Sequence, residues 1–293
     1  MEKTMGRAER VRSMGKGAVI LRVALATALF SVFLKIDALV QVGNILVDWA
    51  WPAVPVLLGI TLVHMLLAAT VVLAVLPVIL GVRRLRDWLP GYVRIDSKAV
   101  LLGLLSFVVF CVLAAVISLS MGIYRGDLSA AFARPDLRPD PDVVGWGYFL
   151  LALVPGIWEE LAFRGLIQHK LRARFSTTLS ILLSATFFGL YHFSNLLTQA
   201  PSQVIGGVVM AFAFGLAWGV MTARSRSVVP AMLSHYLVDA AGQVFLSVDS
   251  ANPALATGFF LLLTLTFAVC NILLAKTMYK EPVPVRAPQP VSP

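Results

Sequence analysis

The chain has 293 residues, of which 59% are hydrophobic and only 13% are charged. A typical soluble domain has about 25% charged residues. This chain therefore has too few polar side chains to cover a water-exposed surface, and it is too apolar for intrinsic disorder. The composition predicts an all-α polytopic membrane protein.

Apolar stretches of about 20 residues, the length that crosses a bilayer, predict the transmembrane helices. Eight such spans lie near residues 17–40, 53–82, 99–122, 143–168, 177–195, 203–222, 228–247 and 255–275. The first span follows a basic stretch, as a signal peptide would. It is too long for a signal peptide and has no small-residue cleavage site, so we expect an uncleaved anchor helix.

The positions of the Lys and Arg residues predict the orientation of these spans, because cations favour the cytoplasmic side of a membrane. They gather before span 1, after spans 2, 4 and 6, and in the carboxyl-terminal tail. The loops on the other side hold only Arg125, Arg134 and Arg138, which nearby aspartates outweigh. Both termini are thus predicted to be cytoplasmic. Topology explains the net charge of +9, so we expect a lipid bilayer and no nucleic acid as a partner.

Span 4 carries three ionisable side chains in its middle: Glu159, Glu160 and Arg164. Each costs on the order of 2.5–3.5 kcal/mol to insert. In a helix Glu160 and Arg164 lie four residues apart on one face and can pair. Glu159 is rotated by about 100° onto another face. A buried carboxylate that no cation holds is suited to act as a general base on water.

Two later spans carry histidines. In span 5, His192 follows Phe188 by one helical turn, so the aromatic ring can wall one side of the imidazole. In span 7, His235 and Asp239 share a face, where the carboxyl group can fix the tautomer of the ring. At 1.5 Å per residue the three motifs reach depths that allow one intramembrane site. His64, without a polar companion, is interpreted as an interhelical hydrogen-bonding residue.

The motifs Glu159-Glu160-x-x-x-Arg164, Phe188-x-x-x-His192 and His235-x-x-x-Asp239 occur in this order within hydrophobic spans. The pattern resembles the CAAX prenyl endopeptidase and bacteriocin-processing (CPBP, or Abi) family of intramembrane glutamic proteases. The resemblance covers about residues 143–247.

The resemblance implies hydrolysis of a peptide bond inside the membrane without a covalent intermediate. Glu159, helped by His192, would deprotonate the attacking water. His235 and Asp239 would stabilise the oxyanion, while Glu160 and Arg164 would fix the geometry. Family members that process prenylated proteins commonly have Asn where this chain has Asp239. Because an ionised carboxylate cannot donate to an oxyanion, Asp239 must be protonated or must act by orienting His235.

Three alternatives remain open. Glu and His side chains also bind zinc, but the chain lacks the H-E-x-x-H spacing and the G-x-S-x-G elbow of serine hydrolases, so we expect an enzyme without a metal or other cofactor. A catalytically inactive immunity or scaffold protein would keep the fold and bind another membrane protein. A proton-coupled transporter would need broken helices in two repeated halves, and the sequence shows no such repeat.

These interpretations divide the chain into three parts. Residues 1–142 form scaffold helices and an acidic outer loop, residues 143–247 form the catalytic core, and residues 248–293 form the last helix and a disordered, proline-rich cytoplasmic tail. The expected substrate is a membrane-associated protein or peptide, which the family cleaves near its carboxyl terminus or its leader. The expected location is a bacterial plasma membrane.

Overall fold

The computed structural model describes residues 15–33, 53–82, 89, 92–127, 149–197, 200–245 and 253–280, and these residues form helices and short connections. The predicted tail from Glu281 and most of the predicted outer loop at 125–142 lie outside the described residues. Cys111 and Cys270 are free, as expected for small apolar residues within spans.

The amino-terminal part contributes three long helical stretches. The first is α2 (Lys16–Phe33), and the second is α4 (Ala53–Thr70), which continues through the wide turn η1 (Val71–Val75) into α5 (Leu76–Leu80). Gly81, in the left-handed conformation, ends α5. The third stretch is α7 (Ser97–Arg125), which begins at Asp96, whose side chain accepts a hydrogen bond from the Ala99 amide.

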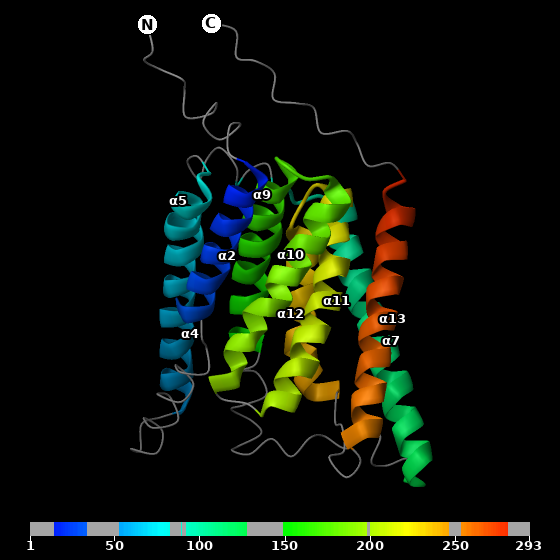
Figure 1. The fold of residues 1–293 in the computed structure, drawn as a ribbon. Helices are drawn as coiled ribbons and strands as arrows, with labels where there is room; N and C mark the ends of the chain where they lie inside the picture. Colours follow the sequence, from blue (N-terminus) through cyan, green and yellow to red (C-terminus); the bar gives the residue numbers. More distant parts are fainter. Residues whose placement is uncertain are drawn as a thin grey trace, which may run out of the picture.

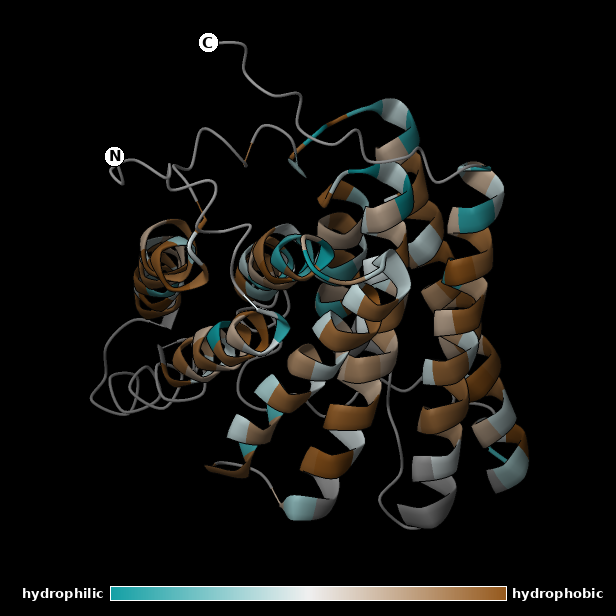
Figure 2. Cartoon of the chain, turned by 45° about the horizontal axis from the view of Figure 1, so that its top comes forward, coloured by the Kyte–Doolittle hydropathy of each residue, from teal (hydrophilic) through white to brown (hydrophobic). Residues whose placement is uncertain are grey.

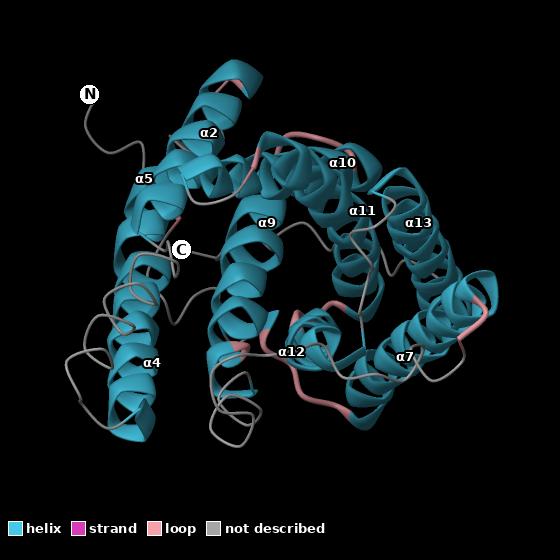
Figure 3. Ribbon diagram, turned by 90° about the horizontal axis from the view of Figure 1, so that it is seen from below, coloured by secondary structure: helices cyan, strands magenta, loops and turns pink. Residues whose placement is uncertain are grey.

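The second half holds the elements that carry the three motifs. They are η2 (Pro155–Glu159), η3 (Leu161–Ile167), α9 (Gln168–Arg172), α10 (Thr177–Tyr191), η4 (His192–Leu197), α11 (Pro201–Ser225), α12 (Val229–Phe245) and α13 (Pro253–Met278). The segments η2, η3 and α9 follow one another as a single helical stretch. Seen along the bundle in Figure 3, this stretch stands between α4 on one side and α12 on the other.

Five helices are long and apolar enough to cross a membrane: Pro55–Leu80, Ser97–Tyr124, Thr177–Leu197, Val204–Ser225 and Gly258–Met278. The other three predicted spans are also helical where the structure describes them, but they do not meet this standard. The stretch from Pro155 holds Glu159, Glu160 and Arg164, and α12 has only 17 residues. The helical class is thus confirmed, whereas the number of eight spans stays a prediction.

The surface along these helices is apolar, and hydrophilic residues gather near the helix ends (Figure 2). Large side chains such as Leu62 on α4 and Val112 on α7 are more than half exposed. Water would penalise such exposure, whereas hydrocarbon does not, so these side chains are suited to face lipid.

The beginning of α2 and the end of α13 lie at the same end of the bundle (Figure 1). Lys16 lies 5.8 Å from the ring centre of Phe175, and Lys98 lies 4.5 Å from that of Tyr279. The predicted cytoplasmic loops therefore share one end of the described chain. The side of the membrane that this end faces stays a prediction.

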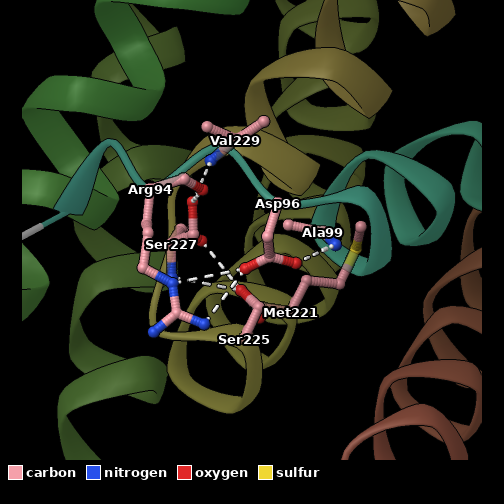
Figure 4. Close-up of polar contacts among 7 residues, drawn as sticks. All are labelled: Arg94, Asp96, Ala99, Met221, Ser225, Ser227 and Val229. Carbon is pink, nitrogen blue, oxygen red and sulfur yellow. Dashed lines mark hydrogen bonds and ion pairs between the residues drawn. The ribbon is translucent and has the colours of Figure 1, made fainter.

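A polar clasp at the same end fixes the start of α7 to the turn between α11 and α12 (Figure 4). The Ser227 hydroxyl donates to the Arg94 carbonyl at 2.6 Å, and the Val228 amide donates to the Tyr92 carbonyl at 2.8 Å. Arg94 also pairs with Asp96 at 3.1 Å. The clasp holds the start of α12, the helix that carries His235, against the residues that precede α7.

Candidate active site

The helix that carries the two glutamates is wound in wide turns rather than in regular α-helical turns. Pro155 opens η2 and has no amide to donate, so the backbone ladder is interrupted there. In the wide turn that follows, the Phe163 carbonyl accepts from the Gln168 amide, and Ser184 of α10 also donates to it, at 2.9 Å. The α-helical geometry expected for Glu159–Arg164 is therefore corrected to a wider one, which is often found at functional sites.

Glu160 and Arg164 form the pair that their spacing predicted. Arg164 Nη1 donates to Glu160 Oε1 at 2.9 Å, and both side chains are fully buried. The same carboxylate oxygen lies 2.9 Å from His235 Nδ1 on α12. His235 Nε2 in turn lies 3.3 Å from Asp239 Oδ2. The four side chains form a continuous row, Arg164–Glu160–His235–Asp239, which we call the charge row.

The charge row can balance its own charge. Carboxylates accept hydrogen bonds, so His235 donates from both nitrogens when Glu160 and Asp239 are ionised, and is then the cationic imidazolium. Cation and anion alternate along the row, and no net charge remains in the apolar interior. Asp239 is the only member with a substantially exposed side chain, at 37%. The row therefore has a closed end at Arg164 and an accessible end at Asp239.

Aromatic rings hold the charge row in place. The His235 ring stacks on Trp218 of α11, with ring centres 4.1 Å apart. The Arg164 guanidinium lies 4.1 Å from the centre of the Phe188 ring, a distance at which a cation is attracted to the ring face. Trp218 itself donates to Ser234 Oγ at 3.0 Å, and Ser234 bonds to Ser106 of α7 at 2.7 Å.

Glycines allow the helices that carry these groups to approach closely. A Cβ on Gly156 would lie 2.8 Å from the Tyr236 Cα, next to His235 in α12. A Cβ on Gly215 would lie 3.2 Å from Arg164 Nη2 and 3.1 Å from the Ala185 Cα. Both positions lack room for a larger side chain because helix backbones meet there.

Among the described residues, Glu159 has no hydrogen bond or ion pair with the charge row, although it lies within electrostatic range of His235 and Arg164. It accepts a hydrogen bond from the Tyr191 hydroxyl at 3.1 Å. It also lines a cavity of about 60 Å³ together with Tyr191 and His64. Glu160 thus contacts α12, whereas Glu159 faces a cavity that α4 helps to form, and these helices stand on opposite sides of the stretch that ends in α9 (Figure 3).

His192 lies at the junction of α10 and η4. Its Nδ1 is 2.9 Å from the Phe188 carbonyl, so Nδ1 carries the proton and donates. The Phe188 ring meets the imidazole edge to face at 5.0 Å, which confirms the predicted wall. In this tautomer Nε2 is an acceptor. Within the described part of the chain, no hydrogen bond or ion pair joins His192 directly to Glu159, and Tyr191 contacts both.

The six side chains singled out in the sequence therefore lie in one region, around the rings of Phe188 and Tyr191. The predicted pairing of Glu160 with Arg164 and of His235 with Asp239 is confirmed by their distances. The contact between His235 and Glu160 was not predicted. Tyr191 and Trp218 were missed as supporting residues, although Trp218 lies between Gly215 and Gly219, a spacing typical of closely packed membrane helices.

The described residues contain no group of three or more His, Cys, Asp or Glu side chains that could hold a metal ion. The two nitrogens of His235 both lie near carboxylates instead. The absence of a cofactor stays a prediction.

One comparison with known proteins bears on this region. Residues 141–241 match the family model described as type II CAAX prenyl endopeptidase Rce1-like. No curated protein and no solved structure matches the chain. The match covers about one third of the chain, includes all six candidate residues, and confirms the resemblance that the three motifs indicated. Peptidase activity is therefore supported at the level of the family.

Proposed function

We propose that this chain, whose residues 141–241 match the type II CAAX prenyl endopeptidase family, is an intramembrane endopeptidase that uses a glutamate to activate water. Its substrate is a membrane-associated protein or peptide. The observation that carries the proposal is the difference between the surroundings of two adjacent carboxylates. Glu160 is locked between Arg164 and His235, while Glu159 meets a tyrosine hydroxyl and a cavity.

In this mechanism Glu159 takes a proton from water as the water oxygen attacks the scissile carbonyl. The proton then passes to the leaving amine as the carbon–nitrogen bond breaks. His192 supports the first step, because its ring is fixed with Nε2 as an acceptor.

His235 would stabilise the oxyanion through Nε2, whose contact with Asp239 is the longest in the charge row, at 3.3 Å. A developing oxyanion can replace that carboxylate as the acceptor. Asp239 then orients His235 before the oxyanion forms and does not itself donate to it. The charge row positions the imidazole, because Glu160 holds its Nδ1 at 2.9 Å.

The test is cleavage of a candidate membrane-anchored peptide by the wild type, Glu159→Gln and His192→Ala in lipid nanodiscs. We expect Glu159→Gln to lower kcat by about 100- to 10,000-fold, the usual contribution of a general base, with unchanged thermal stability. Tyr191→Phe removes the hydroxyl bonded to Glu159 and keeps the carboxylate, so it tests the support of Glu159 and not the base itself. It should lose much less activity.

The same assay separates the alternatives. Full activity of Glu159→Gln would overturn the glutamate mechanism. Activity that is lost with a chelator and regained with stoichiometric zinc would favour a metal-dependent protease. Normal biological function of both variants in cells would favour a non-catalytic immunity or scaffold role, in a bacterial plasma membrane or elsewhere.

A further inference from the structure

The cavity beside Glu159 joins two parts of the chain that are far apart in sequence. Its lining consists of Phe30 from α2, His64 from α4, the catalytic-helix residues Val154, Pro155, Trp158 and Glu159, and Tyr191 from α10. Most of this lining is apolar. The lining residues with ionisable side chains are Glu159, Tyr191 and His64.

His64 is held at this position by the packing of α4. The buried face of this helix and of the turn after it carries Thr61, His64, Ala68 and Val72, at the spacing of one helix face. His64 itself is only 3% exposed. The neighbouring Met65 accepts a hydrogen bond from Trp158 Nε1 at 3.2 Å, which ties α4 to the helix that carries Glu159.

The cavity has room for water. One water needs about 10–15 Å³ of cavity volume, and this cavity has about 60 Å³. A buried water also needs two to four polar partners, and the three polar groups of the lining meet that need.

We infer that this cavity is a water chamber that supplies water to Glu159 from the side opposite the charge row, and that His64 is a positioning residue that anchors water on its far wall. The inference rests on the proposed function. It replaces the interpretation of His64 as an ordinary interhelical hydrogen-bonding residue. It also gives α2 and α4 a part in the reaction, because Phe30 and His64 close the chamber. His64 neither gains nor loses a proton in the reaction and acts only through the position of the water.

The first experiment detects water without any need for activity. Brief X-ray irradiation turns bound water into hydroxyl radicals, which label the side chains beside it. We expect Tyr191, which lines the cavity, to be labelled several-fold more than Phe163, whose ring lies 5.7 Å away but is fully buried outside the lining. His64→Leu should lower the labelling of Tyr191 towards that of Phe163, and His64→Gln should preserve it.

The second experiment measures peptide cleavage by the same variants. His64→Leu should lower kcat by about 10-fold or more, equivalent to about 1.4 kcal/mol in the barrier, with KM within about threefold. His64→Gln should recover most of kcat because an amide also binds water. Thr61→Val is the matched control, since Thr61 lies on the same buried face and its hydroxyl bonds to its own helix at Leu57 O. It should leave kcat unchanged.

The two experiments test the water chamber and the proposed function independently. Equal labelling of Tyr191 and Phe163 in the wild type, or unchanged labelling of Tyr191 in His64→Leu, would overturn the water chamber even if the protein is a protease. The labelling pattern expected above, in a protein that cleaves no membrane-anchored peptide, would support the chamber and overturn the proposed function. Equal loss of kcat in His64→Leu and Thr61→Val would show a purely structural role for His64.

Discussion

In two membrane helices of this protein, the buried polar groups have their hydrogen-bond partners in different places: within the same helix in one case and on neighbouring helices in the other. In α13 the buried Thr264 and Asn271 bond to carbonyls of their own helix, Phe260 O and Phe267 O, at 2.8 and 2.9 Å. In the stretch that begins at Pro155, Glu160 bonds to another helix, through His235, and Ser184 of α10 bonds to Phe163 O.

The surroundings of the two helices differ in the same way. Every residue from Glu160 to Gln168 is buried, whereas α13 exposes a stripe that includes Leu262, Leu265, Val269 and Leu273. A helix that faces lipid must satisfy its polar groups internally, because hydrocarbon offers no partner. In a helix surrounded by other helices, polar groups can instead form hydrogen bonds with those neighbouring helices. Polar groups that cross between helices therefore mark the functional part of this bundle.

The largest difference between the two helices should appear when a polar partner is removed. Arg164→Met leaves the buried Glu160 carboxylate without its cation and should destabilise the protein by about 3–5 kcal/mol. Asn271→Leu in α13 removes only a bond within one helix and should cost about 1 kcal/mol or less. Thermal unfolding in detergent measures both. An equal loss of stability in the two variants would contradict the proposed difference between the two helices.

A smaller difference should follow from adding one methyl group to each helix. Gly156→Ala places a Cβ within 2.8 Å of the Tyr236 backbone, and such overpacking should cost about 1–3 kcal/mol. Gly258→Ala in α13 meets nothing within 4 Å. It should stabilise that helix by about 0.5–1 kcal/mol, because Ala favours a helix over Gly. Destabilisation by both changes would show that α13 is packed as tightly as the site helix.

The smallest difference concerns the cationic ends of the two helices. Lys170 in α9 is only 4% exposed, and no hydrogen-bond partner for its Nζ is found among the described residues. Burial, together with the nearby Arg22 and Arg174, lowers the pKa of Lys170 from 10.5 to about 8. Between these two values the unfolded chain binds more protons than the folded chain. The contribution of Lys170 to stability should therefore rise with pH from about 8 to 10.5.

Lys170→Met should remove this pH dependence and stabilise the protein at pH 7 by about 1 kcal/mol, or about 2–4 °C in Tm. The matched change Lys276→Met at the exposed end of α13 should stay within about 0.5 kcal/mol. The measurement is Tm across pH 7–10.5. A wild-type curve parallel to that of Lys170→Met would contradict the prediction.

The pattern of the sequence went far in predicting this site, and its limits are physical. The spacing of Glu160 and Arg164, and of His235 and Asp239, predicted pairs that depend only on one helix. The contact between His235 and Glu160 depends on how α12 crosses the helical stretch that begins at Pro155. In the sequence, Gly156 indicated that crossing only weakly. His64 has no ionisable neighbour on α4, so only the packing of α4 could place it beside Glu159.

The sequence by itself determined the helical membrane architecture, because long apolar stretches with few charges can satisfy their backbone only as helices in lipid. It also determined which charged residues need a function, since buried charges carry a cost that topology does not explain. The tertiary structure alone decided what each glutamate faces. Two residues adjacent in the chain point to different sides of one helix, and only the neighbouring helices make one side an ion pair and the other a cavity.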